Sequence, residues 1–139
     1  MTEEMAQLWR LVALDQIAGP AGAVSVLEPM PWTDVQRIYL CHLNTAGTVG
    51  GRHAHRSLRQ ILIAVGGGVS VTLRTPTSEV AHLLRPQREA LVLWPGLWRE
   101  YAAVDGPATL MVAASEEYRE DDYLRSWQEY CEWFRTIGE

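Results

Sequence analysis

The chain is divided into short apolar segments that recur about every ten residues, each bounded by glycine, proline or small polar residues. Several segments alternate apolar and polar residues, as a half-buried strand does, whereas residues 60–65 are apolar on both faces, as in a fully buried strand. This spacing indicates a β-sandwich or a small β-barrel. We predict strands at residues 24–28, 37–43, 60–65, 69–73, 80–84, 90–94 and 109–114.

The two ends of the chain depart from this pattern. Residues 1–23 carry weak signals, and we expect an N-terminal arm in which residues 3–14 form a short helix or an irregular segment. The charged tail, residues 116–139, has Tyr123, Trp127 and Tyr130 at helical spacing, which predicts one or two amphipathic helices. These aromatic side chains either cover an open end of the barrel or stack on a nucleotide base. We therefore expect a single domain, residues 1–139, whose barrel spans residues 24–115.

Composition limits the class of protein. With 139 residues and 47% hydrophobic content, the chain can form a core without disulfides or structural metals, so we expect Cys41 and Cys131 to be free thiols. The net charge of −5 is concentrated after residue 115, which argues against a nucleic-acid partner. Neither a long apolar run nor a signal-peptide pattern is present, so we expect a cytoplasmic protein with no membrane partner.

The most informative polar residues are His53 and His55, which are followed by Gln60. Residues two apart on a strand point to the same face, so the two imidazoles can reach one ligand. The polar segment 56–59 is short enough for a turn, which brings Gln60 back beside the pair on the next strand. An isolated pair of this kind often lies on a solvated strand face, but the flanking glycines and Gln60 favour a functional site here.

This pattern resembles the metal-binding strands of the cupin superfamily, with altered ligands. Metal-binding cupins usually carry glutamate where this chain has Gln60, and a neutral amide is a poorer ligand for a divalent cation. After the Pro95–Gly96 turn, Trp98 and Arg99 occupy the place of the expected third histidine. We therefore predict no catalytic metal and no cofactor. His42 and His82 lie in apolar runs of their own, and we expect structural roles for them.

Without a metal, the histidine pair is suited to moving protons. An imidazole titrates near neutral pH, so it can accept a proton from carbon and return it elsewhere on the substrate. The pair therefore points to an isomerase or an epimerase.

From about Leu27 to Phe134, the chain resembles the WxcM-like cupin family of nucleotide-sugar 3,4-ketoisomerases, which act on dTDP-4-keto-6-deoxy-D-glucose. The resemblance depends on several segments together rather than on the histidines alone. They are residues 37–39, residues 51–56, Gln60, residues 98–100, residues 110–115, Tyr118 and residues 122–125.

The resemblance implies an all-β fold, a small jelly-roll barrel with a short C-terminal helix or helices, assembled as a homodimer with exchanged strands. It implies metal-free transfer of a proton between C3 and C4 of the dTDP-linked 4-keto sugar through an enediol. His53 and His55 are then acid/base residues, and Tyr39 is a further catalytic residue. The implied substrate contacts are Arg37, Arg52, Arg56, Gln60, Trp98, Arg99, Tyr123 and Arg125. Gln60, Tyr39 or an arginine would hydrogen-bond the developing enolate oxygen.

Three other functions compete with this hypothesis. A 3,5-epimerase acting on the same kind of nucleotide sugar would also use a histidine base. A non-catalytic nucleotide-sugar-binding barrel is suggested by Gly50, because many relatives have arginine at that position. A metal-dependent oxygenase is the third.

Overall fold

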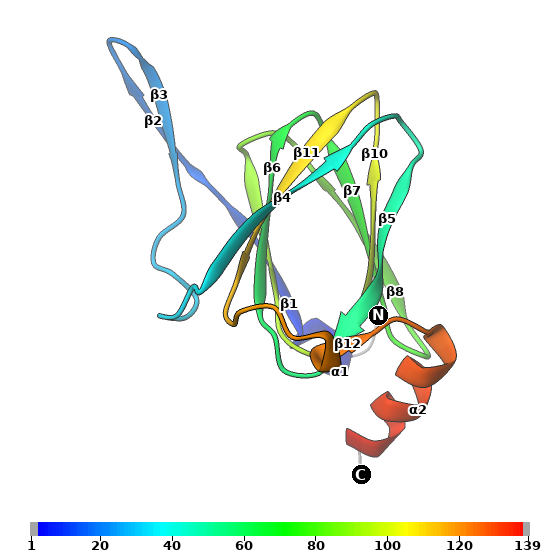
Figure 1. Cartoon of the computed structure of the whole chain (residues 1–139). Helices are drawn as coiled ribbons and strands as arrows, with labels where there is room; N and C mark the ends of the chain where they lie inside the picture. The colour runs from blue at the N-terminus through cyan, green and yellow to red at the C-terminus, as the bar shows by residue number, and fades with distance from the viewer. Residues whose placement is uncertain (1–2, 138–139) are drawn as a thin grey trace.

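The computed structural model describes residues 3–137, which form two five-stranded antiparallel sheets, one facing the other (Figure 1). The elements of the first sheet are β1 (Trp9–Ala13), β4 (Arg37–Leu43), β6 (Gln60–Gly66), β9 (Glu89–Leu93) and β11 (Ala108–Ala114). Those of the second are β5 (Val49–His55), β7 (Val69–Arg74), β8 (Glu79–Leu84), β10 (Trp98–Ala103) and β12 (Tyr123–Leu124). The remaining elements are α1 (Glu3–Ala6), β2 (Asp15–Gly19), β3 (Gly22–Val26), the 3-10 helix η1 (Glu120–Asp122) and α2 (Trp127–Ile137).

The first sheet has the strand order β1-β9-β6-β11-β4, and the second has the order β12-β5-β10-β7-β8. The expected all-β jelly roll with a C-terminal helix is confirmed. Neither helix of the described residues is long and apolar enough to cross a membrane.

The main core fills the space between the two sheets. The alternation along β7 shows how the sequence produces it, because Val69, Val71 and Leu73 are fully buried while Ser70 and Thr72 are not. Strand β9 is buried along its whole length, as expected for an apolar strand covered on both faces. Each fully buried aliphatic side chain stabilises the fold by about 1.5–3 kcal/mol.

Two further clusters cover the outer faces of the sheets. The loop between β3 and β4 lays Trp32 over the first sheet, against Ile61, Val92 and Ala113. On the second sheet, Tyr130 of α2 packs with Trp98 and Leu124, and its hydroxyl lies 2.9 Å from the Gly96 carbonyl oxygen. The tail aromatics at positions 127 and 130 therefore pack on protein rather than standing free in solvent.

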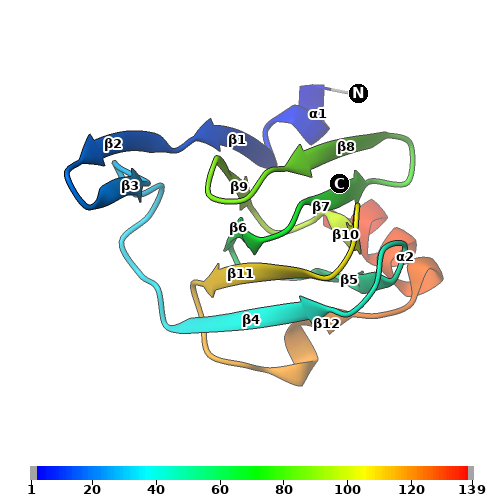
Figure 2. The ribbon, with the colours of Figure 1, turned by 90° about the horizontal axis from the view of Figure 1, so that it is seen from above.

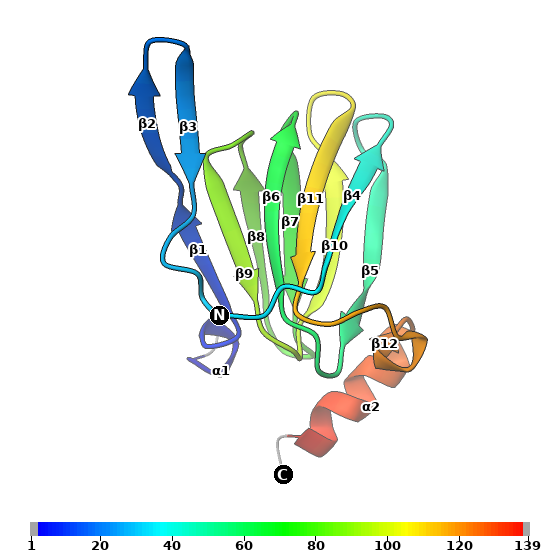
Figure 3. The same cartoon turned by 60° about the vertical axis from the view of Figure 1, so that its left-hand side comes forward.

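Strands β2 and β3 form a hairpin that projects away from both sheets (Figures 2 and 3). Residues 24–28, which we expected to begin the barrel, lie partly in this hairpin instead. Conversely, β1 pairs with β9 along five residues, although it falls within the expected N-terminal arm. Its sequence signal is weak because β1 is an edge strand, and none of its residues is fully buried.

The other predicted strands are found close to their expected bounds, and residues 37–43 are matched at both ends by β4. The strand β10 was not predicted, because the turn before it dominated the pattern of that segment. In the tail, Tyr123 lies in β12 rather than in a helix, since Ser126 begins α2 by accepting a hydrogen bond from the Glu129 amide.

A β-bulge in β5 determines which face the histidines occupy. Arg99 on β10 is opposite His53, whereas the next residue, Glu100, is opposite Gly51, so Arg52 is an extra residue. Gly51 and Arg52 both have positive φ angles, 79° and 58°. Arg99 and Tyr101 of β10 point into the barrel. The extra residue shifts the alternation of β5 by one position, so that His53, opposite Arg99, also points inward. If β5 kept the pairing of Gly50 with Tyr101 but had no bulge, His53 would lie opposite Trp98 and the histidine pair would face the outside of the sheet.

Replacing Gly51 with alanine is expected to disturb this bulge. A Cβ at position 51 would lie 3.0 Å from the Arg99 carbonyl oxygen, on a backbone whose φ of 79° disfavours any side chain. We expect a loss of about 1–3 kcal/mol in the free energy of unfolding, measured by urea denaturation. Gly106→Ala serves as a control, because a Cβ there meets no atom within 4 Å. Equal stability of Gly51→Ala and the wild type would contradict the assigned role of the bulge.

Candidate active site

The histidine pair lies at the end of the barrel where β5 ends and β6 begins (Figure 1). The two imidazole rings are 4.8 Å apart, centroid to centroid, and nearly perpendicular. His53 is 8% exposed and His55 is fully buried. The Nε2 atoms of both rings are buried and have no hydrogen-bond partner among residues 3–137. Two imidazole nitrogens at the same end of the barrel are therefore free to bind a polar ligand.

Asp122 sets the tautomer of His55. Its carboxylate lies 2.8 Å from His55 Nδ1, and it also accepts hydrogen bonds from the amide and the hydroxyl of Ser57. Burial alone would raise the pKa of Asp122, but the hydrogen bonds from His55 and Ser57 outweigh burial and hold it below its usual range. An ionised Asp122 requires a proton on Nδ1, which leaves the Nε2 lone pair of a neutral His55 available as a base.

Burial keeps both histidines neutral. It lowers the pKa of His53 to about 3, with a further decrease from the positive charge of Arg99. Burial lowers the pKa of His55 to about 4, because the hydrogen bond that its Nδ1 donates to Asp122 offsets only part of the effect of burial. Neutral imidazoles can accept protons at physiological pH without first losing one.

A chain of hydrogen bonds joins three of the predicted site residues across the barrel. Arg99, fully buried, donates from Nη1 to Gln60 Oε1 at 2.5 Å. Gln60 in turn donates from Nε2 to the Tyr39 hydroxyl at 3.0 Å. Burial is the main cause that raises the pKa of Tyr39 to about 12, so its phenol stays protonated. These hydrogen bonds hold the protonated Tyr39 hydroxyl near the same end of the barrel as the histidines.

Arg37 and Tyr123 lie over the histidine pair. The Tyr123 ring is 4.5 Å from the ring of His55 and 5.1 Å from that of His53. Arg37 is within 3.5 Å of the Tyr123 hydroxyl and stacks over Tyr39 at 4.7 Å. Arg125 stacks on Tyr123 at 4.1 Å. These residues form an aromatic and cationic cover, which suits an anionic ligand.

Three of the predicted contacts are not brought to the histidine pair. Arg52, in the bulge, points outward and lies 4.0 Å from Glu100. Arg56 fastens the tail to the end of β5, because it donates to the carbonyl oxygens of Asp121 and Tyr123. Trp98 faces the outer cluster and packs on Trp127. The alternation of β10 explains this, since Arg99 and Trp98 are neighbours and must point to opposite faces.

Two residues of the site received no role from the sequence. Asp122 lies 67 positions after His55, and nothing local links the two. Tyr101 is buried beside His53, with ring centroids 6.4 Å apart, and its hydroxyl has no partner within residues 3–137. The alternation of β10 places Tyr101 on the same face as Arg99, and this was the only available signal. Gly50 lies opposite Tyr101 and also faces the interior.

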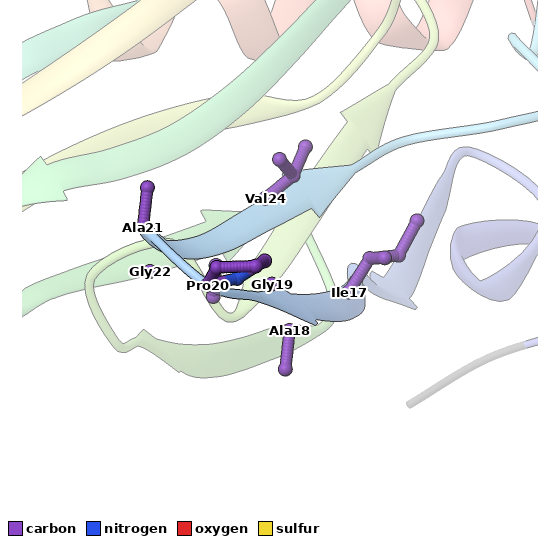
Figure 4. Close-up of a pocket in the computed structure, with 8 residues that line it drawn as sticks. Ile17, Ala18, Gly19, Pro20, Ala21, Gly22 and Val24 are labelled. Atoms are coloured by element: carbon purple, nitrogen blue, oxygen red, sulfur yellow. The ribbon is translucent and has the colours of Figure 1, made fainter.

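No group of three or more histidine, cysteine, aspartate or glutamate residues within 3–137 is arranged to hold a metal ion. Surface recesses lie elsewhere, one along the hairpin at residues 17–24 (Figure 4) and another at residues 74–79 beside Trp127. In this structure the histidine pair is covered by protein rather than open to solvent.

The fold and this site define a cupin-type barrel with a buried histidine pair. The family model described as FdtA: WxcM-like, C-terminal, matches residues 7–135, and the chain therefore belongs to this family.

The chain is similar to characterised and solved proteins along most of its length. It is 26% identical to the TDP-4-oxo-6-deoxy-alpha-D-glucose-3,4-oxoisomerase of Aneurinibacillus thermoaerophilus over 132 residues, 93% of this chain and 94% of that protein. The crystal structure of the sugar 3,4-ketoisomerase QdtA from Thermoanaerobacterium thermosaccharolyticum, in complex with TDP, superposes with a TM-score of 0.83 at 29% identity, covering 93% and 96% of the two chains. A histidine-to-asparagine mutant of QdtA, in complex with TDP-4-keto-6-deoxyglucose, gives 0.84 at 28% identity, covering 98% and 97%.

The lowered pKa values of the histidines predict a stability that depends on pH. The histidines bind protons near pH 6.5 in the unfolded chain, but His55 and His53 do so only near pH 4 and pH 3 in the folded protein. Below pH 6.5 proton binding therefore favours the unfolded chain, so the free energy of unfolding has its full value above pH 6.5 and decreases as the pH falls. Between pH 7 and pH 5 each histidine should account for a loss of about 2 kcal/mol in the free energy of unfolding. Urea denaturation at several pH values measures this loss.

His53→Asn removes the contribution of His53 and should reduce the loss between pH 7 and pH 5 by about 2 kcal/mol. An unchanged pH dependence in this variant would contradict the assignment to the histidine pair.

Proposed function

We propose that this protein is a 3,4-ketoisomerase that converts dTDP-4-keto-6-deoxy-D-glucose into the corresponding 3-keto sugar by proton transfer through the histidine pair. One observation carries the proposal. Two neutral imidazoles, whose Nε2 atoms have no hydrogen-bond partner in the described part of the chain, share one buried end of the barrel in a member of the FdtA family. The relatives named above as TDP-sugar 3,4-ketoisomerases add support.

In the proposed reaction an imidazole Nε2 removes the proton from C3 as the C4 carbonyl becomes an enediolate. The C3 hydroxyl then gives its proton to the oxygen on C4, and a histidine returns a proton to C4. C3 becomes the carbonyl, so no electrons or atoms are gained or lost. Asp122 supports this chemistry by stabilising the positive charge that His55 acquires on protonation.

The developing negative charge on the oxygen of C4 requires a hydrogen-bond donor. We assign this role to Tyr39, whose phenol is protonated and belongs to the chain that begins at the buried cation Arg99. A donor of this kind stabilises an oxyanion most in a buried site.

The diphosphate and the base of the nucleotide are assigned to the cover of the site. The guanidinium of Arg37 lies at the Tyr123 hydroxyl and that of Arg125 stacks on the Tyr123 ring, and guanidinium forks suit phosphate oxygens. Arg125 is held by Glu120 in this structure, so a diphosphate would compete with that carboxylate.

NMR of the product formed from dTDP-4-keto-6-deoxyglucose tests the function. We expect the carbonyl to move from C4 to C3 and, in deuterated water, label to enter C4. Label at C3 and C5 with the carbonyl still at C4 would show a 3,5-epimerase instead. Thermal stabilisation by dTDP without turnover would show a binding barrel.

His53→Asn and His55→Asn test the roles of the histidines in the same assay. Each should lower kcat by at least about 100-fold while dTDP still binds, because a general acid or base contributes about 10²–10⁴-fold. His42→Asn is a matched control, since His42 is exposed on β4. Two fully active site variants would remove the histidines from the mechanism.

We further propose that the protein acts as a homodimer in which the β2–β3 hairpin of one protomer packs on the other. Within residues 3–137 the hairpin strands pair with each other and with no other strand, and nine of their ten residues are exposed. A lone two-stranded hairpin is marginally stable in water. Ile17 and Val24 are cross-strand neighbours, 56% and 58% exposed, and present an apolar surface on the hairpin (Figure 4). On the edge strand β4, Ile38 and Leu40 are exposed as well.

The double variant Ile17→Asp/Val24→Asp should sediment as a monomer, whereas the wild type should sediment as a dimer at micromolar concentration. Two buried carboxylates without partners would oppose association. Leu83→Asp, at an equally exposed apolar position on β8, should remain dimeric. A monomeric wild type, or a dimeric double variant, would contradict the proposed interface.

A further inference from the structure

The side-chain amide of Gln60 has only one orientation that satisfies its two neighbours. A guanidinium has donors and no acceptor, so the Gln60 oxygen must face Arg99. The amide nitrogen must then face Tyr39, and it donates to the phenol oxygen at 3.0 Å. Gln60 is fully buried, as is Arg99, so no solvent competes for these groups.

This orientation determines where the Tyr39 proton can point. The phenol oxygen accepts from Gln60, and therefore its own proton is not used in that bond. Arg99 spends its other recorded hydrogen bonds on the Leu97 carbonyl oxygen. The second amide proton of Gln60 and two guanidinium protons of Arg99 have no recorded acceptor among residues 3–137 either, but Tyr39 is the member of this hydrogen-bond chain that offers a hydroxyl proton.

We propose that Gln60 is a positioning residue, whose neutral amide holds the oxygen of Tyr39 as an acceptor and so leaves the Tyr39 proton free for the oxyanion of the reacting sugar. This inference rests on the proposed function and deepens it. The positive charge of Arg99 polarises the Gln60 amide, which in turn polarises the Tyr39 hydroxyl.

A glutamate of the same size could not do this. Its carboxylate would be ionised beside Arg99 and would offer only acceptor atoms. One carboxylate oxygen would bind the guanidinium, and the other would take the Tyr39 proton. The phenol would then present lone pairs to the oxyanion instead of a proton. Glutamine at position 60 therefore does more than omit a metal ligand, because it supplies a donor that glutamate lacks.

The test is a double-mutant cycle of Gln60→Glu and Tyr39→Phe, with Gln128→Glu on the exposed face of α2 as a control for charge. We expect Gln60→Glu to lower kcat about 10²–10³-fold, the usual effect of losing one oxyanion donor. The KM and the affinity for dTDP should change only a few-fold. Tyr39→Phe should show the same loss, and the double variant should be no worse than either single variant.

Losses that multiply in the double variant would overturn the inference, because Gln60 would then act independently of Tyr39. A fully active Gln60→Glu would also overturn it. If Gln60→Glu does not fold, Gln60→Met replaces it, removing the amide but leaving the Tyr39 proton unclaimed. Its kcat should fall less than that of Tyr39→Phe, and a larger fall would again overturn the inference.

A second readout is independent of turnover. The Raman doublet of tyrosine reports whether a phenol oxygen mainly accepts or donates hydrogen bonds, and the difference from Tyr39→Phe isolates Tyr39. We expect Tyr39 to change from acceptor to donor in Gln60→Glu bound to dTDP, and an unchanged signal would refute the proposed orientation. If the wild type does not isomerise the sugar, the proposed function fails, while the Raman result still decides the role of Gln60.

Discussion

The bulge at Gly51 and Arg52 is the constraint on which the site depends. It adds one residue to β5 opposite Glu100 and so turns His53 and the following alternate residue, His55, into the barrel. A strand that kept the pairing of Gly50 with Tyr101 but lacked the bulge would present the histidines to the outer face. The left-handed backbone at Gly51 is therefore part of the construction of the site.

Once inside, the histidines lie close to a buried cation without being charged themselves. Arg99 is opposite His53, and its hydrogen bonds within the described residues go to neutral acceptors. A buried guanidinium without a carboxylate partner is costly for the folded state. The same charge stabilises any negative charge that develops nearby. The guanidinium that destabilises the fold therefore lies where, under the proposed mechanism, an enediolate would form.

The sequence predicted the parts of the fold that have strong local signals. Strand β4 was matched at both ends, because the polar residues Gln36 and Asn44 flank it. The edge strand β1 was missed, since an edge strand is half exposed and its alternation is weak. The histidine pair was predicted to face the interior, yet the residue that makes this possible, Arg52, was expected to bind substrate. A bulge leaves only glycine as a hint, and one glycine does not reveal the register.

The contact between Asp122 and His55 could not be predicted from the sequence, because the two residues lie 67 positions apart. The carboxylate that fixes the His55 tautomer comes from η1, near the end of the chain, and is anchored by Ser57 on the turn after β5. The barrel strands can be complete while His55 still lacks its proton acceptor. The basicity of this imidazole is therefore acquired only when the C-terminal segment docks. Under the proposed mechanism, activity during synthesis or refolding would therefore follow the docking of the segment around Asp122 rather than the completion of the barrel strands.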